Sequence, residues 1–299
     1  MLSCLTAPGD AARGVVCCRL APFHQSVSRV RRYPSDSTDA QWAVIDPLLP
    51  DPEWLRGQGG RRETQCRRAV VDAIFYLVDN GIKWRALPVD FPLWSTVYNY
   101  FAAWEAVGVT QDVLDDLRDR VRLAEGRAAA PSAAVIDSQS VKAAETVAAT
   151  SRGFDAGKKI NGTKRHIAVD TLGLLLCVLV TAASVQDRDG ARPLLSLLAN
   201  TCHRVRLVWA DGAYAGKLVD WARRSWAMTL EIVKRSDDMT GFVVLPRRWV
   251  VEGTLAWITR HRRCVRDYER LPAHHEAMVR WSMIRITSRR LTKYNSPHR

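Results

Sequence analysis

The 299-residue sequence predicts an α/β fold: a mixed five-stranded sheet with flanking helices, preceded by a small all-α domain. A change in the spacing of apolar residues along the chain predicts this fold. Up to about residue 123, apolar residues recur at the intervals of amphipathic helices. After an Ala/Pro-rich stretch at 126–132, short apolar runs of strand length alternate with helical segments. We therefore expect a helical domain over 33–128 and an α/β domain with a basic carboxyl tail over 129–299.

Residues 1–32 are expected to be a disordered extension or the product of a misassigned start. They mix Gly, Pro, Ser and Arg with isolated cysteines and lack the continuous apolar stretch of a secretion signal. Elsewhere, no uncharged apolar run reaches the ~18 residues of a membrane span. The sequence therefore predicts neither export nor membrane insertion.

Four helices are predicted in the amino-terminal domain, starting at Thr38, covering 63–80, starting at Ser95 and covering 110–123. Thr38 and Gln41 have the spacing of a capping box, and Asn80-Gly81 is a typical helix stop. Short helices separated by turns suit either a helix-turn-helix DNA reader or a small interaction bundle.

The charge of this segment leaves both alternatives open. Its net charge of −4 argues against DNA reading, whereas a group of four arginines supports it: Arg61, Arg62, Arg67 and Arg68. The domain is accordingly assigned to binding of DNA ends or to assembly.

The second domain is expected to contain five strands, at 133–137, 163–170, 174–181, 205–210 and 229–234. Its helices are expected at 190–200, 217–226 and 250–262. Three strands joined by tight turns form an antiparallel meander, and strands joined through helices must run parallel. This order is typical of the ribonuclease-H-like arrangement.

The overall charge indicates a polyanionic partner. The net charge is +13 and the isoelectric point is near 9.8, which favours nucleic acid. Residues 246–299 carry the largest share, with 13 basic and 4 acidic side chains. The seven cysteines form no CxxC pair and have no zinc-finger spacing, so reduced thiols in a cytosol are expected.

Three acidic residues are candidates for a metal site. Asp137 and Asp211 each follow an apolar strand, and adjacent strand ends are where open α/β sheets place their sites. Glu252 lies on the final predicted helix, on a partly apolar face where an unpaired acid would be costly to bury. Hard oxygen ligands suit Mg²⁺ or Mn²⁺, and two such ions can act on a phosphodiester. The rival acids near strand ends are Asp170, Asp187 and Asp189.

Five motifs follow one another in this order: VIDSQSVK (135–142), GKKINGTKRHIAVDTLGLLL (157–176), VQDRDGA (185–191), WADGAYAG (209–216) and RRWVVEGTLAWITRHRRCVRDYER (247–270). Together they resemble the catalytic domain of bacterial insertion-sequence transposases of the DDE class. YPSDSTDAQWAVIDPLLP (33–50) and GIKWRALPVDFPLWSTVYNYFAAW (81–104) resemble the helical domain that precedes it in that group. The resemblance covers about 33–290.

The resemblance implies that Asp137, Asp211 and Glu252 are the catalytic, metal-binding acids. It also implies DNA strand cleavage and transfer of a 3′-hydroxyl to target DNA, with two Mg²⁺ or Mn²⁺ ions as cofactors. Expected partners are double-stranded DNA, at the inverted repeats and the target, and a second copy of the chain in a homodimer or larger assembly. A cytoplasmic, nucleoid-associated protein is expected.

The chain also departs from the family's signature around the third acid. Arg248 matches an expected Arg, but Leu245, Gly253 and Thr259 replace residues that relatives carry. A plain metal-dependent nuclease and an inactive DNA-binding relic or repressor therefore remain as alternatives.

Basic residues in two places are expected to hold the DNA backbone: Lys158, Lys159, Lys164, Arg165, Arg248, Arg260, Arg262 and Arg263. The first four straddle Asn161-Gly162, which is predicted to be a turn. The others surround or follow the helix that carries Glu252. Trp249 and Trp257, close to this acid, are expected to be core residues.

Overall fold

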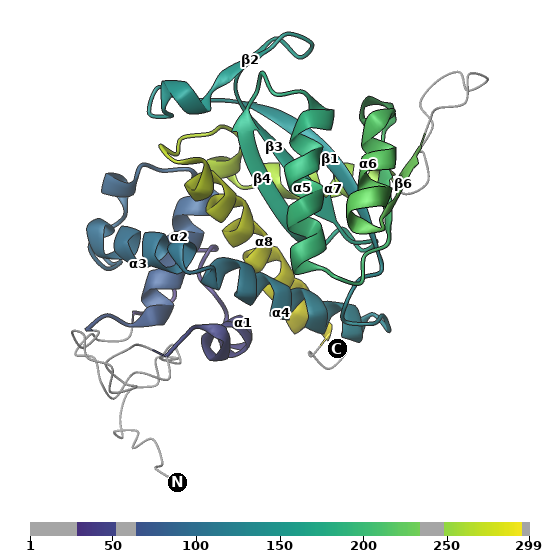
Figure 1. Ribbon diagram of the computed structural model, residues 1–299. Coiled ribbons are helices and arrows are strands. Elements are labelled where there is room, and N and C mark those ends of the chain that lie inside the picture. The colour runs from purple at the N-terminus through teal and green to yellow at the C-terminus, as the bar shows by residue number, and fades with distance from the viewer. Residues whose placement is uncertain (1–28, 52–63, 234–247, 295–299) are drawn as a thin grey trace, which may run out of the picture.

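The computed structural model describes residues 29–51, 64–233 and 248–294. Its amino-terminal part is helical, with α1 (Asp39–Ile45), α2 (Arg67–Asn80), α3 (Trp94–Ala106) and α4 (Val109–Ala124), and short 3₁₀ turns at Asp46–Leu48 and Trp84–Ala86. All four predicted helices are present (Figure 1). Thr38 and Gln41 form the predicted capping box, and Gly81 ends α2 in the left-handed region at φ 69°.

Two of the arginines that supported a DNA-reading helical domain lie inside it. Arg67 and Arg68 are each 2% exposed. Arg67 donates to the carbonyl of Pro50, while Arg68 pairs with Asp39 at 2.7 Å and donates to the carbonyl of Ser37. These arginines therefore hold helices together and do not face DNA; Arg61 and Arg62 lie outside the described residues.

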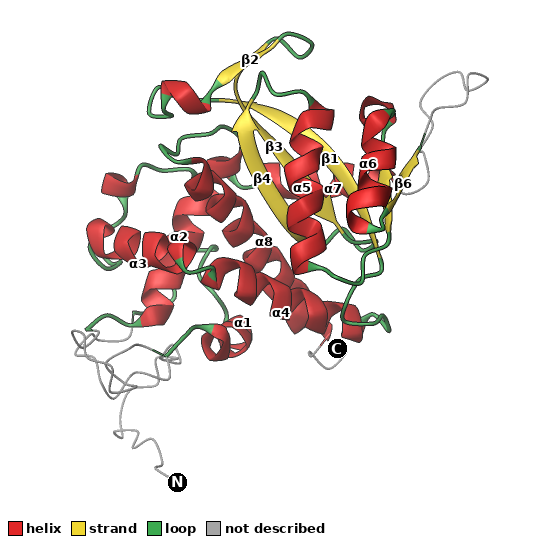
Figure 2. Ribbon diagram, in the orientation of Figure 1, coloured by secondary structure: helices red, strands yellow, loops and turns green. Residues whose placement is uncertain are grey.

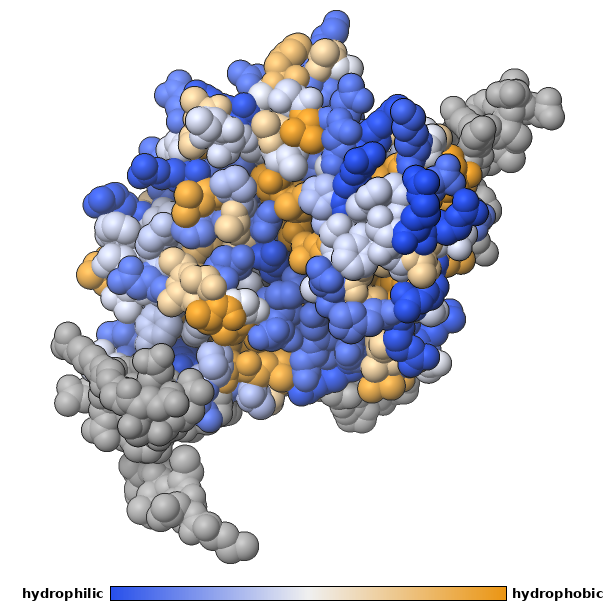
Figure 3. Space-filling view, in the orientation of Figure 1, coloured by the Kyte–Doolittle hydropathy of each residue, from blue (hydrophilic) through white to orange (hydrophobic). Residues whose placement is uncertain are grey.

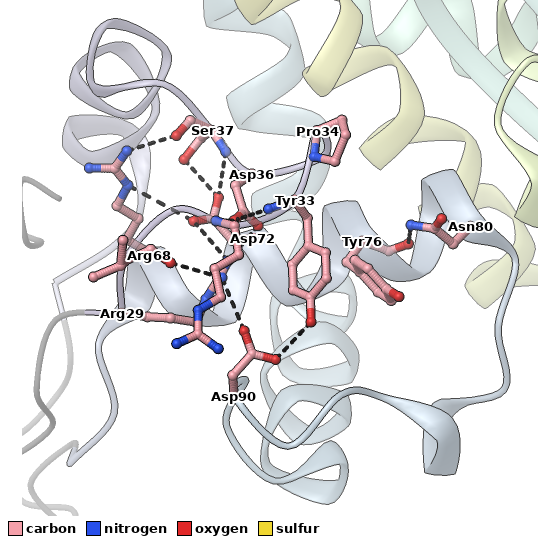
Figure 4. Close-up of polar contacts among 12 residues, drawn as sticks. Arg29, Tyr33, Pro34, Asp36, Ser37, Arg68, Asp72, Tyr76, Asn80 and Asp90 are labelled. Carbon is pink, nitrogen blue, oxygen red and sulfur yellow. Dashed lines mark hydrogen bonds and ion pairs between the residues drawn. The ribbon is translucent and has the colours of Figure 1, made fainter.

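A polar network fixes the start of this helical region (Figure 4). The backbone N–H and hydroxyl of Ser37 both donate to Asp72, at 2.8 and 2.7 Å, and Arg29 pairs with Asp36. The Tyr33 hydroxyl donates to Asp90 at 3.0 Å. Burial raises the pKa of Asp72 to about 6 despite the two Ser37 donors.

The sheet has six strands, β1 (Ala133–Lys142), β2 (Gly153–Asp155), β3 (Ile160–Val169), β4 (Leu175–Ala182), β5 (Leu207–Ala210) and β6 (Thr229–Ile232). Their order is β2-β3-β1-β5-β6, with β4 also paired to β3. The meander is antiparallel, whereas β1, β5 and β6 run parallel. The predicted mixed, ribonuclease-H-like sheet is confirmed, with one short strand more than expected.

The extra strand corrects the predicted turn at Asn161-Gly162. Both residues lie inside β3, and the turn occupies 156–159, between β2 and β3. Gly162 is needed for a different reason, since a Cβ there would overlap the backbone carbonyl of Val141 on β1. Close strand approach, which a sequence motif does not distinguish from a turn, accounts for this glycine.

Helices cover both faces of the sheet (Figures 1 and 2). One face packs against α5 (Asp187–Thr201) and α6 (Lys217–Trp226), through residues such as Ala134 and Ile136 of β1. The other face carries α7 (Arg248–Thr259), and Val135 points to it. Successive strand residues alternate between the two faces, so odd-numbered residues of β1 lie on the α7 side.

A long helix that was not predicted, α8 (Pro272–Tyr294), lies between the helical region and the sheet. It contacts α1 to α4 on one side and β4 on the other. One continuous core consequently joins the amino-terminal helices, the α7 face of the sheet and α8. Within the described residues, no helix has the length and apolar character needed to cross a bilayer.

Candidate active site

Asp137 lies on β1, and Asp211 directly follows the neighbouring strand β5 at the matching position of the register. The parallel register pairs Ala133 with Leu207 and continues to Val135 with Trp209. Two residues beyond that last pair are Asp137 and Asp211 themselves. By the period-two alternation of strands, both belong to the α7 side of the sheet. The expectation that these strands are neighbours is confirmed.

The local geometry of each aspartate differs. Asp211 follows β5 and caps a 3₁₀ turn, accepting a hydrogen bond from the Ala213 N–H at 2.9 Å. Asp137 accepts from the Ser138 N–H at 2.7 Å. Asp137 was expected at a strand end, but β1 continues to Lys142 because β3 is long enough to pair with it throughout. Only the pairing with β5 ends before Asp137.

Glu252 lies on α7, which packs on β1 and β3. Its neighbours Val251 and Leu255 are buried, whereas Glu252 itself is exposed. The expected cost of burying this acid therefore does not arise. In the three described stretches of chain, no group of three or more His, Cys, Asp or Glu side chains is arranged to hold a metal ion. The parallel register thus leads to Asp137 and Asp211, and Glu252 lies on the helix that packs on β1 and β3.

The oxygen chemistry of the adjacent pair suits a divalent cation. Asp137 on β1 and Asp211 after β5 supply the hard carboxylate donors that Mg²⁺ and Mn²⁺ prefer. Asp137 and Asp211 are residues that could hold such an ion, and Glu252 lies on α7 over the same sheet.

The rival acids have structural roles of their own. Asp170 is fully buried, pairs with Arg122 and accepts from the N–H groups of Leu172 and Leu174, so it holds the β3–β4 turn. Asp187 starts α5 and is bound by Lys164. Asp189 is exposed in the first turn of the same helix.

A polar cluster on the opposite face of the sheet adjoins Asp137. Lys164 lies between Asp187, at 2.9 Å, and Asp155, at 3.5 Å. Ser138, next to Asp137, donates its hydroxyl to Asp187 at 2.7 Å. We call Ser138, Asp155, Lys164 and Asp187 the Lys164 cluster. Through Ser138 it fixes β1 directly beside Asp137.

Tyr214 is a further residue of this region that the sequence motifs did not single out. It is 1% exposed, and burial raises the pKa of its hydroxyl, with the nearby charges of Asp137, Asp187 and Asp211 adding to the effect. Its position three residues after Asp211, in WADGAYAG, was the available signal. Tyr214 therefore lies close to both strand acids.

The structure separates the predicted DNA-contacting residues into two groups. Lys158 and Lys159 in the β2–β3 turn, and Arg260 and Arg262 after α7, are exposed. Lys164, Arg165 and Arg263 are buried, with at most 5% exposed. The side chain of Arg248 lies outside the described part of the chain.

Internal partners explain the three buried cations. Lys164 belongs to the cluster above, and Arg165 donates to Gln139 and to the carbonyl of Cys264. Arg263 pairs with Glu269 at 2.7 Å and donates to the carbonyl of Ile82. These residues were expected on the surface, but they stabilise the interior and are not available to a DNA backbone.

The two tryptophans near Glu252 were expected to be core residues, and only one of them is. Trp257 packs partly buried against the core, as predicted, but Trp249 is 58% exposed.

The residues that depart from the family signature lie near Glu252 in the sequence. Gly253 has open space around it, since a Cβ there would meet no atom within 4 Å. The Thr259 hydroxyl donates back to the helix carbonyls of Leu255 and Ala256, and Leu245 lies outside the described residues.

Comparison with known proteins identifies the family. The protein-family model described as "Transposase DDE domain" matches residues 128–286, more than half of the chain. The chain belongs to this DDE transposase family. All three candidate acids fall inside the match. A second family model, described as "Putative transposase of IS4/5 family", matches residues 38–114, which lie within the helical region.

Two relatives from Burkholderia cepacia support membership of the DDE transposase family. An "Insertion element IS402 uncharacterized 16.2 kDa protein" is 31% identical over 107 residues, covering 35% of this chain and 71% of the relative. A "Putative transposase for insertion sequence element IS402" is 32% identical over 126 residues, covering 40% of this chain and 59% of the relative. No solved structure matches.

Proposed function

We propose that this chain is a DNA transposase that binds the inverted ends of its insertion element, hydrolyses a DNA strand and joins the freed 3′-hydroxyl to target DNA. The observation that carries this proposal is the parallel β1–β5 register, which leads to Asp137 on β1 and to Asp211 directly after β5. Family membership supplies the reaction class. Both steps are in-line substitutions at phosphorus, so one site can serve them in turn.

Mg²⁺ or Mn²⁺, as a pair of ions, is the proposed cofactor, held by Asp137, Asp211 and Glu252. When bound, such ions supply electrostatic stabilisation to the attacking and leaving oxygens of a phosphodiester. The protein's own contribution is to position these carboxylates. The Lys164 cluster holds β1 beside Asp137, and the 3₁₀ turn orients Asp211.

Four exposed cations remain as proposed DNA-backbone contacts: Lys158, Lys159, Arg260 and Arg262. Arg248 stays in the proposal on the strength of the family motif. Backbone contacts of this kind position DNA without reading its sequence. The helical region over 33–128 is proposed to bind the element ends or to assemble a homodimer, since two ends must be processed together.

The test is incubation of the full chain with the flanking element's end DNA and Mg²⁺ or Mn²⁺, beside the Asp211→Asn variant. Cleaved and joined products from the wild type alone are expected. Cuts without joining would replace the proposal by a plain nuclease. DNA that is shifted but uncut by both proteins would indicate a relic that binds without chemistry, for which Gly253→Arg is the first repair because the position has room.

Substitution of each acid makes a more specific prediction. Asp137→Asn, Asp211→Asn and Glu252→Gln are each expected to abolish metal-dependent cleavage, because each removes a negatively charged ligand with little change of shape. DNA affinity measured in a chelator should stay within about threefold of wild type, since cations dominate backbone binding. Normal cleavage by any one variant would remove that residue from the active site.

A further inference from the structure

A cavity of about 630 Å³ opens between α7, the carboxyl end of α8 and the β3–β4 turn. We call it the α7–α8 cavity. Four cations and two indoles are among its lining residues: Arg260, Arg289, Arg290, Lys293, Trp249 and Trp257. None of the described lining residues carries a carboxylate. The cavity is therefore strongly cationic.

Most of this positive charge is not neutralised inside the protein. Within the described residues, Arg260 and Lys293 form no ion pair, and both are exposed. Arg289 donates to the backbone carbonyl of Pro34 at 3.0 Å, a neutral acceptor. Arg290 pairs with Glu125 at 2.7 Å. The cavity thus retains a positive charge that an anionic ligand would balance.

The wall of the cavity is built from fixed elements. Gly173, at φ 77°, lets the β3–β4 turn approach α7 so closely that a Cβ would crowd Thr254 and Trp257. The Thr254 hydroxyl donates to the Gly173 carbonyl at 2.7 Å, which ties turn and helix together. At the rim, Trp249 leaves a large aromatic surface 58% exposed. Cations beside an exposed indole fit a chain of phosphates with flat, partly apolar groups between them.

The cavity is distinct from the acid site but borders it. Glu252 and Gly253 are consecutive on α7 and therefore point about 100° apart around the helix axis. Gly253 lines the cavity and Glu252 does not. One helix consequently presents the candidate acid on one side and the cationic cavity on the other.

We propose that the α7–α8 cavity binds the phosphate backbone of the DNA substrate and aligns it along α7, with Arg260, Arg289 and Lys293 as the contacting cations. The proposal rests on the proposed function for its ligand. It assigns binding residues on α8 that lie 37 and more positions beyond Glu252 in the sequence. Such contacts would raise affinity uniformly across sequences.

The experiment measures binding of the full chain to a labelled duplex of arbitrary sequence by fluorescence anisotropy, in a chelator, over a series of KCl concentrations. Each phosphate contact contributes about 0.9 to the slope of log K against log salt. Arg289→Ala/Lys293→Ala is therefore expected to lower the slope by about 2 and the affinity by at least tenfold near 0.1 M salt. Lys293→Glu alone, at an exposed position in the last turn of α8, should lower the slope by about 1.

The matched control is Arg223→Ala/Arg224→Ala on α6. Both residues are exposed, and α6 packs on the opposite face of the sheet from α7. Hydrophilic side chains gather over α6 on the surface shown in Figure 3. The control removes the same two positive charges from a net charge of +13. Its slope and affinity therefore measure the effect of net charge alone, without contacts in the cavity. If both α8 variants match this control in slope and affinity, the proposal is overturned. Circular dichroism spectra and thermal midpoints verify that each variant folds.

This result is separable from the test of the transposase reaction. A wild-type protein that cuts and joins DNA, combined with α8 variants that bind like the control, would overturn the cavity proposal and leave the reaction standing. A wild type that never cuts DNA, combined with a reduced slope for the α8 variants, would establish the cavity as a DNA site in an inactive relative.

Discussion

Lys164 shows how the environment of one residue determines its role. Its side chain is 6% exposed, and its ammonium group lies between Asp155 and Asp187. A hydrogen bond from Ser140, with lesser help from Lys158 and Lys164, lowers the pKa of Asp155 to about 2. The lysine therefore compensates two carboxylates at the edge of the candidate active site.

Removing this cation should destabilise the protein. Lys164→Ala leaves two carboxylates without their central partner, and breaking a buried pair from one side costs about 3 kcal/mol or more. Lys158→Ala, at an exposed position six residues earlier, should change the unfolding free energy by less than about 0.5 kcal/mol. Urea unfolding of both variants measures the difference, and equal stabilities would contradict the assigned role of Lys164.

At the scale of single elements, two helical glycines illustrate opposite uses of the same residue. Gly190 in the first turns of α5 lies against the buried ring of His166, which a Cβ would overlap. Gly253 in α7 has no atom within 4 Å of the equivalent position. In α5 the glycine allows helix and sheet to pack closely, whereas in α7 it only weakens the helix.

The same substitution should consequently have opposite effects in the two helices. Gly190→Ala is expected to lower the unfolding free energy by about 1–3 kcal/mol through overpacking. Gly253→Ala is expected to raise it by up to about 1 kcal/mol, the propensity difference between Gly and Ala. Chemical denaturation gives both values. Destabilisation by Gly253→Ala would mean that the α7 backbone needs glycine at this position.

At the scale of the whole molecule, ion pairs of α8 connect the basic carboxyl segment with the acidic amino-terminal segment. Its arginines pair with acids of the helical region: Arg280 with Glu105 at 2.6 Å, Arg285 with Asp79 at 3.0 Å, and Arg290 with Glu125 at 2.7 Å. The acidic amino-terminal segment and the basic carboxyl segment thus partly neutralise each other across the shared core. Three cations of the α7–α8 cavity, Arg260, Arg289 and Lys293, take no part in these pairs and are the ones proposed to contact DNA.

Buried histidines make the stability of the whole molecule depend on pH. Burial lowers the pKa of His166 and of His261 to about 4, from an ordinary value of 6.5. Because the unfolded chain binds these protons first, stability should fall as pH decreases from about 6.5 to about 4. The slope contributed by each histidine is at most about 1.4 kcal/mol per pH unit. Denaturation midpoints measured across this range test the prediction.

Asp72 provides an internal control for that pH dependence. Its pKa is raised from 3.8 to about 6, so its contribution has the opposite sign: folding favours its protonated form, and stability is lost as pH rises from about 4 to 6. Asp72→Asn should therefore make the fall in stability towards acid pH steeper than in the wild type. A shallower dependence in this variant would show that Asp72 titrates normally in the folded state.

Local patterns in the sequence predicted the four amino-terminal helices and five of the six strands, but not α8 or β2. The Thr38 capping box, the Gly81 stop and the apolar strands depend on nearby residues, so their signals are complete in the sequence. The crossover through α5 predicts the direction of β5, whereas its position beside β1 was expected only from the ribonuclease-H-like arrangement as a whole. The strand that was not predicted, β2, has only three residues, which is too short to give a periodic pattern.

Only the tertiary structure decided which charges face solvent. Lys164, Arg165 and Arg263 look like surface cations in the sequence, but their partners Asp187, Gln139 and Glu269 come from other segments or from beyond a turn. The α7–α8 cavity likewise joins Trp249 to Lys293 through packing that no local pattern encodes. Charge is a property of the residue, whereas its burial and pairing depend on contacts between distant parts of the chain.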